Sequence, residues 1–332
     1  MLQTIKRAWV IPDIRKKIVF TLLILLIFRI GNAIPVPYVD TGLLKTYLDQ
    51  LSTTVLGLYN VMSGGAFASA TLFALGVQPY INSSIIIQLL TIAIPALERL
   101  AQEGGEEGKR KIQSITRYAT VAIAILQGWG YYALMKHNVG ILTQTGFWPA
   151  LVIIVSFIAG SAFVMWMGEQ ITEFGVGNGI SIILFTGIVS RAPAMITSIV
   201  VGVRNYFSDV DTSGWTEQQL ANFHKMHPAV ALMLVVGILA LIVFIVFIHN
   251  SERKVPVQYA KRVVGRKMYG GQSTHIPIKV NLSGVLPIIF AQSIAMIPAT
   301  IGMFVPSSQV EGSGWNTFLT VFNSNSALYA VI

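Results

Sequence analysis

Residues 228–249 read PAVALMLVVGILALIVFIVFIH, a stretch without Lys, Arg, Asp or Glu. A helix needs about 20 consecutive, mostly apolar residues to cross the hydrocarbon core of a bilayer. The sequence therefore predicts an all-α fold, a polytopic membrane helix bundle in which about seven spans are complete. The other six predicted spans are roughly 18–34, 72–96, 118–135, 150–168, 180–202 and 282–304.

The composition agrees with a membrane protein. Hydrophobic residues make up 54% of the 332 residues and charged residues only 11%, whereas soluble domains carry about 25% charged residues. There is no cysteine, which excludes disulfides, thiolate metal sites and thiol catalysis. No small-residue cleavage site follows the first apolar stretch, so we interpret that stretch as a retained span rather than a signal peptide. Residues 325–332 resemble the first turns of an eighth span, and we expect the sequence to continue.

The basic residues predict the orientation. Of 23 Lys and Arg residues, five lie in the N-terminal arm, five in the connection after the second span and seven in the connection after the sixth. Short cytoplasmic connections are enriched in Lys and Arg. These three segments therefore lie on one side of the membrane, and the N-terminus is predicted to be cytoplasmic.

The sequence contains no pattern typical of an enzyme or a pump. The spans hold no array of Asp, Glu or His in their middles, whereas intramembrane ionisable groups normally mark an ion or proton path. A phosphate-binding glycine loop, an HExxH motif and a nucleophile elbow are also missing. Four glutamates between residues 98 and 107 are explained by a solvated turn. We therefore predict no catalytic, cofactor-binding or metal-binding residues.

Residues 55–70 read VLGLYNVMSGGAFASA, an uncharged segment that is too short to cross. Gly64-Gly65 would break a helix in its middle. Non-helical backbone at membrane depth is tolerated only inside protein or beside a water-filled cavity. A re-entrant segment here thus implies a cavity, and the alternative is an external loop that rests on the surface.

Two spans share the pattern G-V-x-P-x-I, at residues 76–81 and 284–289. The predicted orientation makes the first of these spans enter from outside and the second from inside. Two inverted, pseudo-symmetric halves, residues 1–205 and 206–332, would produce this relation and would place the working site at their interface. The alternative is ordinary helix packing through small residues.

The connection 251–281 is long and basic, with Glu252 as its single acidic residue. Anionic lipid headgroups, an acidic protein surface or ribosomal RNA could each bind it. Charge alone does not choose among these partners.

Several long motifs resemble the SecY family of translocon channel subunits, and the resemblance runs along essentially the whole chain. The family has ten spanning helices, of which the last three have no complete counterpart here. The motifs are SGGA at 63–66, FALGVQPYI at 73–81, SIIIQLL at 84–90, GVGNGISI at 175–182, YAKR at 259–262, GR at 265–266 and QSTHIPIKVN at 272–281.

The resemblance implies an hourglass channel between the two halves, sealed by a ring of aliphatic side chains and by a plug near residues 56–70. A ring of this kind closes around a chain without sequence preference and can gate by dewetting. The implied ring residues are Val77, Ile81, Leu184, Ile188 and Ile289. The implied plug residues are Tyr59, Asn60, Met62, Ser63, Gly64, Gly65 and Phe67.

The resemblance also implies a lateral gate through which signal sequences reach lipid, and a docking surface on the basic connection. Gate residues would be Asn82, Gln88, Gln292 and Ser293, for which packing hydrogen bonds are an equal alternative. Docking residues for the SecA motor or the ribosome would be Lys261, Arg262, Arg266 and Lys267. Further implied partners are SecE and SecG-type small membrane subunits, signal sequences, translocating polypeptides and membrane lipids.

The implied function is to translocate secretory polypeptides across the bacterial plasma membrane and to insert membrane proteins laterally into it. Energy would come from the docked partner, because the chain has no nucleotide site of its own. One alternative is a small-solute secondary transporter with broken helices, which should carry a polar or charged site at the midplane. Another alternative, a membrane scaffold, would need neither the re-entrant segment nor the basic connection.

Overall fold

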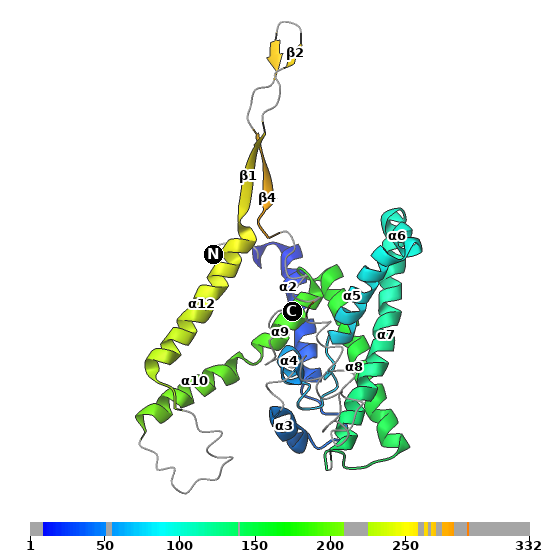
Figure 1. Cartoon of the computed structure of the whole chain (residues 1–332), viewed down its shortest axis with the longest axis vertical. Helices are drawn as coiled ribbons and strands as arrows, with labels where there is room; N and C mark the ends of the chain where they lie inside the picture. Colours follow the sequence, from blue (N-terminus) through cyan, green and yellow to red (C-terminus); the bar gives the residue numbers. More distant parts are fainter. Residues whose placement is uncertain are drawn as a thin grey trace, which may run out of the picture. The chain divides into compact units, whose positions relative to one another are not determined.

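The computed structural model describes residues 9–50, 55–138, 140–208, 225–257, 262–264, 267–269, 274–281 and Ala291 (Figure 1). The predicted seventh span lies outside the described residues apart from Ala291. The chain divides into two compact units, one up to Ala192 and the other from Pro193 to Ile289. Each unit is treated by itself below.

The first unit is helical. Its helices are α2 (Pro12–Gly31), α3 (Thr41–Gln50), α4 (Val55–Met62), α5 (Gln78–Ala93), α6 (Pro95–Gln102), α7 (Gly105–His137), α8 (Phe147–Phe174) and α9 (Gly179–Val189). Figure 1 shows α5, α7 and α8 side by side, and polar contacts join them. The buried Ser83 hydroxyl of α5 donates to the Thr116 carbonyl of α7 at 2.7 Å. Arg117 of α7 pairs with Glu169 of α8 at 2.8 Å.

The predicted second span is broken at both ends. Its helix α5 begins only at Gln78, because Pro79 lacks an N–H and fits the first turn of a helix. At Ile94 the backbone is extended (φ −110°, ψ 111°), as the following Pro95 favours. α5 and α6 are bent by 102° at this point. Residues 72–77, which the sequence assigned to the span, form turns instead.

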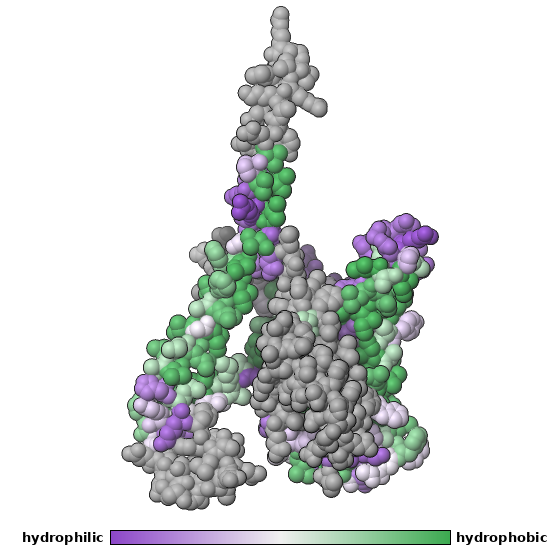
Figure 2. All heavy atoms as spheres, in the orientation of Figure 1, coloured by the Kyte–Doolittle hydropathy of each residue, from purple (hydrophilic) through white to green (hydrophobic). Residues whose placement is uncertain are grey.

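Within the described residues, three helical segments are long and apolar enough to cross a membrane, and the bent pair α5–α6 would be a fourth. The three segments are Phe147–Phe174, Gly179–Phe207 and Pro228–Asn250. The predicted first and third spans overlap α2 and α7, but neither helix is among the segments that pass this test of length and apolar composition. Figure 2 shows hydrophobic side chains below a hydrophilic tip at α6, as expected for helices that leave lipid at that level.

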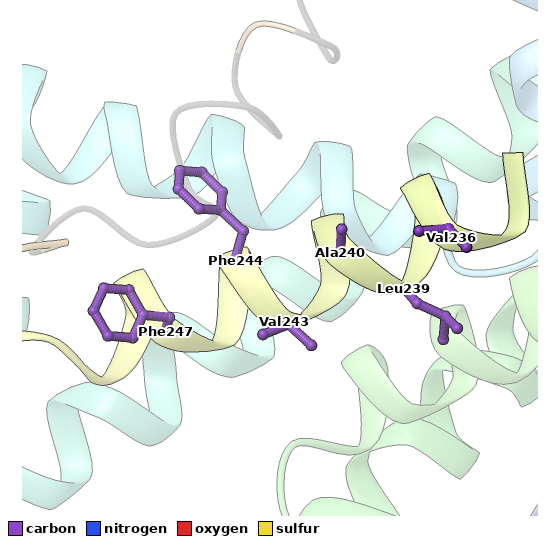
Figure 3. A pocket seen from close by; sticks show the side chains of 6 residues that line it. All are labelled: Val236, Leu239, Ala240, Val243, Phe244 and Phe247. Atoms are coloured by element: carbon purple, nitrogen blue, oxygen red, sulfur yellow. The ribbon is translucent and has the colours of Figure 1, made fainter. Parts of the chain in front are cut away.

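The second unit contains α10 (Ala192–Phe207), α12 (Pro228–Asn250) and a β-ribbon. α12 is apolar on all sides, and only 6% of its most apolar window is buried. Figure 3 shows one apolar stripe along it, from Val236 through Ala240 to Phe247. A helix that is apolar all round is typical of a membrane span, so α12 confirms the segment with which the sequence argument began.

The basic connection forms strands, which the sequence analysis did not predict. β1 (Glu252–Val257) pairs antiparallel with β4 (Thr274–Lys279), with Glu252 opposite Lys279 and Val257 opposite Thr274. Beyond them, β2 (Arg262–Val264) pairs with β3 (Lys267–Tyr269). Pro256 and Pro277 are tolerated because each strand of a two-stranded ribbon has a free edge. The connection is therefore a β-ribbon in an otherwise helical chain.

Candidate functional site

The segment from residue 55 to residue 77, named here the 55–77 segment, consists of α4 followed by a run of turns. Polar groups of the segment itself satisfy part of its backbone, and further backbone bonds join Leu72 to Ile34 and Ala70 to Val36. The Asn60 side-chain oxygen accepts from the Ala68 N–H at 3.0 Å, and the Asn60 carbonyl accepts from the Gly65 N–H at 2.9 Å. The Ser63 hydroxyl accepts from the Phe67 N–H at 3.1 Å. These bonds satisfy part of the non-helical backbone, as its burial requires.

Aromatic side chains hold the 55–77 segment against α7. Phe67 is 1% exposed and stacks on Tyr131, with ring centroids 4.3 Å apart and planes at 19°. The Tyr131 hydroxyl donates to the Phe67 carbonyl. Tyr59 also packs against Phe67, with ring centroids 4.9 Å apart, and its hydroxyl donates to the Leu75 carbonyl at 3.3 Å. The segment is therefore anchored to α7 by a buried stack and by the Tyr131 hydroxyl, whereas the bond from the Tyr59 hydroxyl to Leu75 stabilises the segment internally.

Glycines bring the 55–77 segment into backbone contact with α9. Gly64 has φ of +68°, a conformation that residues other than glycine rarely adopt. A Cβ added at Gly187 of α9 would lie 2.8 Å from the Met62 carbonyl oxygen, which is too close for any side chain. The contact thus requires glycine at both positions. An isolated glycine inside an apolar helix often has a packing role, and this signal could have identified Gly187 from the sequence.

A small cavity lies where the 55–77 segment meets α9 and the start of α5. Its volume is about 10 Å³, and Met62, Ser63, Val77 and Leu184 are among its lining residues. A cavity needs at least about 10–15 Å³ of this kind of volume to hold one water molecule. The junction is therefore closed almost to the size of a single water. Phe28 and Ile183 also line it, and the sequence analysis did not identify them.

The five implied ring residues have different surroundings. Val77 and Leu184 line the same cavity, so the structure brings these two together. Ile81 is 8% exposed and its N–H donates to the Val77 carbonyl at 3.0 Å, one turn further along α5. Ile188 lies one turn beyond Leu184 and is 50% exposed. Ile289 lies outside the described residues.

The implied gate residues are described only in part. Asn82 on α5 has a buried side-chain oxygen without a hydrogen-bond partner in the described part of the chain. Gln88, nearly two turns further on, is exposed. Gln292 and Ser293 lie outside the described residues. A buried oxygen that lacks a donor is destabilising by about 1–3 kcal/mol, so Asn82 is the member of this group that the packing leaves unexplained.

Two of the four implied docking residues belong to the β-ribbon. Arg262 begins β2 opposite Tyr269, and Lys267 begins β3 opposite Val264. Both therefore lie in the outer pair of strands. Lys261 and Arg266 lie outside the described residues.

Long apolar helices and a helix pair bent by 102° are typical of a polytopic membrane protein. Comparison with known proteins narrows this class. The SecY family model matches residues 71–332. The chain belongs to the SecY family, which confirms the resemblance inferred from its motifs.

Curated relatives are protein translocase subunits SecY. The chain is 41% identical to the Streptomyces scabiei protein over 330 residues, covering 96% of this chain and 70% of that protein. It is 40% identical to the protein of Escherichia coli strain K12 over 312 residues, covering 93% of this chain and 65% of that protein. The chain thus spans about two thirds of the length of these relatives. A secondary transporter is not favoured by these matches.

Solved structures confirm the fold. One described as "The structure of a protein conducting channel" matches with a TM-score of 0.55 and 17% identity, over 87% of this chain and 58% of that one. Another, described as "Sec61 in the Canine ribosome-channel complex from the endoplasmic reticulum", matches with a TM-score of 0.53 and 16% identity, over 87% of this chain and 59% of that one. The predicted polytopic helical membrane fold is therefore confirmed.

Proposed function

We propose that this chain, with the remainder of its full-length parent, forms a protein-conducting channel that translocates secretory polypeptides and inserts membrane proteins laterally. The observation that carries this proposal is the packing of residues 56–70, the implied plug, against α7 and α9, with Met62 and Ser63 beside Val77 and Leu184. It is supported by the family to which the chain belongs. A plug built of short turns can leave its seat without breaking a spanning helix, although the bond from the Val36 N–H to the Ala70 carbonyl must then separate.

Closure follows from size and chemistry. The cavity of about 10 Å³ is no larger than one water molecule needs, and its mostly apolar lining disfavours water in a narrow constriction. Opening requires the Phe67 stack and the contact at Gly187 to separate. The aliphatic ring of Val77, Ile81, Leu184, Ile188 and Ile289 then closes around the passing chain, offering no hydrogen bonds and so no sequence preference.

The lateral exit would lie along α5. The buried Asn82 oxygen without a described partner supports a seam there, because a polar group at a helix interface that opens can be satisfied in one state and not in another. Asn82 and Gln88 would face Gln292 and Ser293 across this gate.

Orientation and partners complete the proposal. The N-terminus is cytoplasmic, and the two inverted halves are residues 1–205 and 206–332 in the bacterial plasma membrane. The β-ribbon is then cytoplasmic and docks the SecA motor or the ribosome through Lys261, Arg262, Arg266 and Lys267. SecE and SecG-type subunits accompany the chain, and it binds signal sequences and lipids but no cofactor.

The experiment tethers the plug in its seat. The 332 residues contain no cysteine. The double substitution Met62→Cys and Leu184→Cys therefore introduces the only two thiols among them. It is made in the full-length parent, which is assembled with its partner subunits. Both positions line the same cavity. A short, cleavable bifunctional thiol reagent should block transport of a secretory precursor into membrane vesicles, and cleavage of the reagent should restore it.

Each single-cysteine variant treated with the same reagent is the control, and it should transport normally. Normal transport by the fully crosslinked double variant would contradict the proposal, because the plug would then not need to move.

A further inference from the structure

A groove of about 1000 Å³ lies between the C-terminal end of α7 and the N-terminal end of α8, and none of its described lining residues belongs to the 55–77 segment. From α7 it is lined by Trp129, Tyr132, Ala133 and Lys136. These positions follow i, i+3, i+4 and i+7, which is one face of a helix. The groove therefore runs continuously along two packed helices and is not a gap in a loop.

α8 contributes a matching face. Phe147, Leu151 and Ile154 line the groove, again with the spacing of one helical face. The wall is apolar over its length and Leu151 is 39% exposed. Phe147 is 74% exposed at the first turn. Exposed aromatic rings at the end of a span are typical of the membrane–water interface.

Helix geometry gives the depth of the groove. At 1.5 Å per residue, Arg117 and Lys136 are separated by roughly 29 Å along α7, which matches the hydrocarbon thickness of about 30 Å. If Arg117 lies at one membrane–water interface, Lys136 lies at the level of the lipid headgroups at the opposite interface. Trp129 lies roughly 10 Å deeper, at the level of acyl chains.

Polar groups at the headgroup end lack partners in the part of the chain that the structure describes. Lys136 and His137 line the groove, are exposed, and make no ion pair or hydrogen bond there. Tyr132 lines it at 9% exposure, and its hydroxyl has no described hydrogen-bond partner. No acidic side chain is among the described lining residues. The site thus combines the positive charge of Lys136 and the hydrogen-bonding side chains of His137 and Tyr132 with the apolar part of the groove.

We propose that this groove binds one anionic phospholipid, with its phosphate and headgroup at Lys136, His137 and Tyr132 and an acyl chain along Trp129, Leu151 and Ile154. The charge selects an anionic over a zwitterionic lipid. The apolar trough selects a membrane lipid over a free phosphate, because a free anion would leave the trough exposed.

The test uses the full-length parent assembled with its partner subunits in nanodiscs of phosphatidylcholine with a minority of phosphatidylglycerol. Trace photoactivatable analogues of either lipid carry the reactive group on the acyl chain. We expect phosphatidylglycerol to label peptides that contain Trp129 or Ile154, and to label them more strongly than phosphatidylcholine. In Lys136→Gln/His137→Gln this labelling should fall by about five-fold or more, as expected for loss of a cation near anionic headgroups.

Lys45→Gln is the matched control, because Lys45 is exposed on α3 and does not line the groove. It should label like the unmodified protein. Equal labelling by the two lipids would overturn the proposal, as would unchanged labelling in Lys136→Gln/His137→Gln. Absence of lipid labelling in the assembled complex would also overturn it, since a protein subunit would then cover the groove.

Discussion

Replacing Tyr131 by Phe removes one hydroxyl that holds the plug and leaves the aromatic stack in place. That hydroxyl donates to the Phe67 carbonyl, to which the Ala70 N–H also donates at 3.1 Å. The carbonyl therefore keeps one partner, and the change removes only the net contribution of one hydrogen bond, about 1 kcal/mol. If the bond exists only while the plug is seated, the unseated population should rise about five-fold.

The assay is the resting ion conductance of the full-length complex in planar bilayers, without motor or precursor. Tyr131→Phe should raise the open probability by about five-fold. Tyr118→Phe on the same helix is the control, because Tyr118 is 78% exposed and makes no contact with the plug. An open probability equal to that of the unmodified channel in Tyr131→Phe, or an equal rise in both variants, would refute the reasoning.

Three further predictions concern other parts of the chain. Gly187→Val places a side chain against the end of α4, where a Cβ would lie 2.8 Å from a carbonyl oxygen. The resting ion leak of this variant should exceed that of the control Gly237→Val, because a Cβ at Gly237 has nothing within 4 Å. Glu169→Gln removes the 2.8 Å ion pair between Arg117, whose side chain is 47% exposed, and Glu169, whose side chain is 13% exposed. Because the pair is partly exposed, stability should fall by about 1 kcal/mol, seen as a lower melting temperature, and an unchanged melting temperature would contradict a contribution of the pair. Arg262→Glu in β2 should weaken binding of SecA or ribosomes in a salt-dependent manner, and unchanged binding at low salt would exclude Arg262 from the docking surface.

Much of the fold could be predicted because lipid imposes a simple rule on composition. The run from residue 228 to residue 249 and the run from 150 to 168 both lie within helices that are long and apolar enough to span. Gly64-Gly65 indicated the end of α4, because residues with positive φ interrupt a helix. Each of these signals lies in a short stretch of sequence and does not depend on contacts with residues distant in the chain.

The remaining features depend on partners distant in the chain. The register of β1 with β4 joins Glu252 to Lys279, and charge alone could not distinguish this ribbon from a loop. The spacing of Leu184 and Ile188 predicts a shared helix face, but it does not say at which level a cavity lies. Likewise, nothing in the sequence around Tyr131 indicates that its hydroxyl reaches the plug.

The most direct test of the central claim is a photo-crosslinker at Val77 in the full-length complex, with a secretory precursor stalled at successive lengths by a folded C-terminal domain. Val77 is 4% exposed and lines the small cavity that it shares with Leu184. Val243 on α12 is 68% exposed and serves as the lipid-facing control. The account predicts motor-dependent crosslinks at Val77 whose position on the precursor moves with the stall length. Crosslinks at Val243 but none at Val77 would contradict a polypeptide pore at this site.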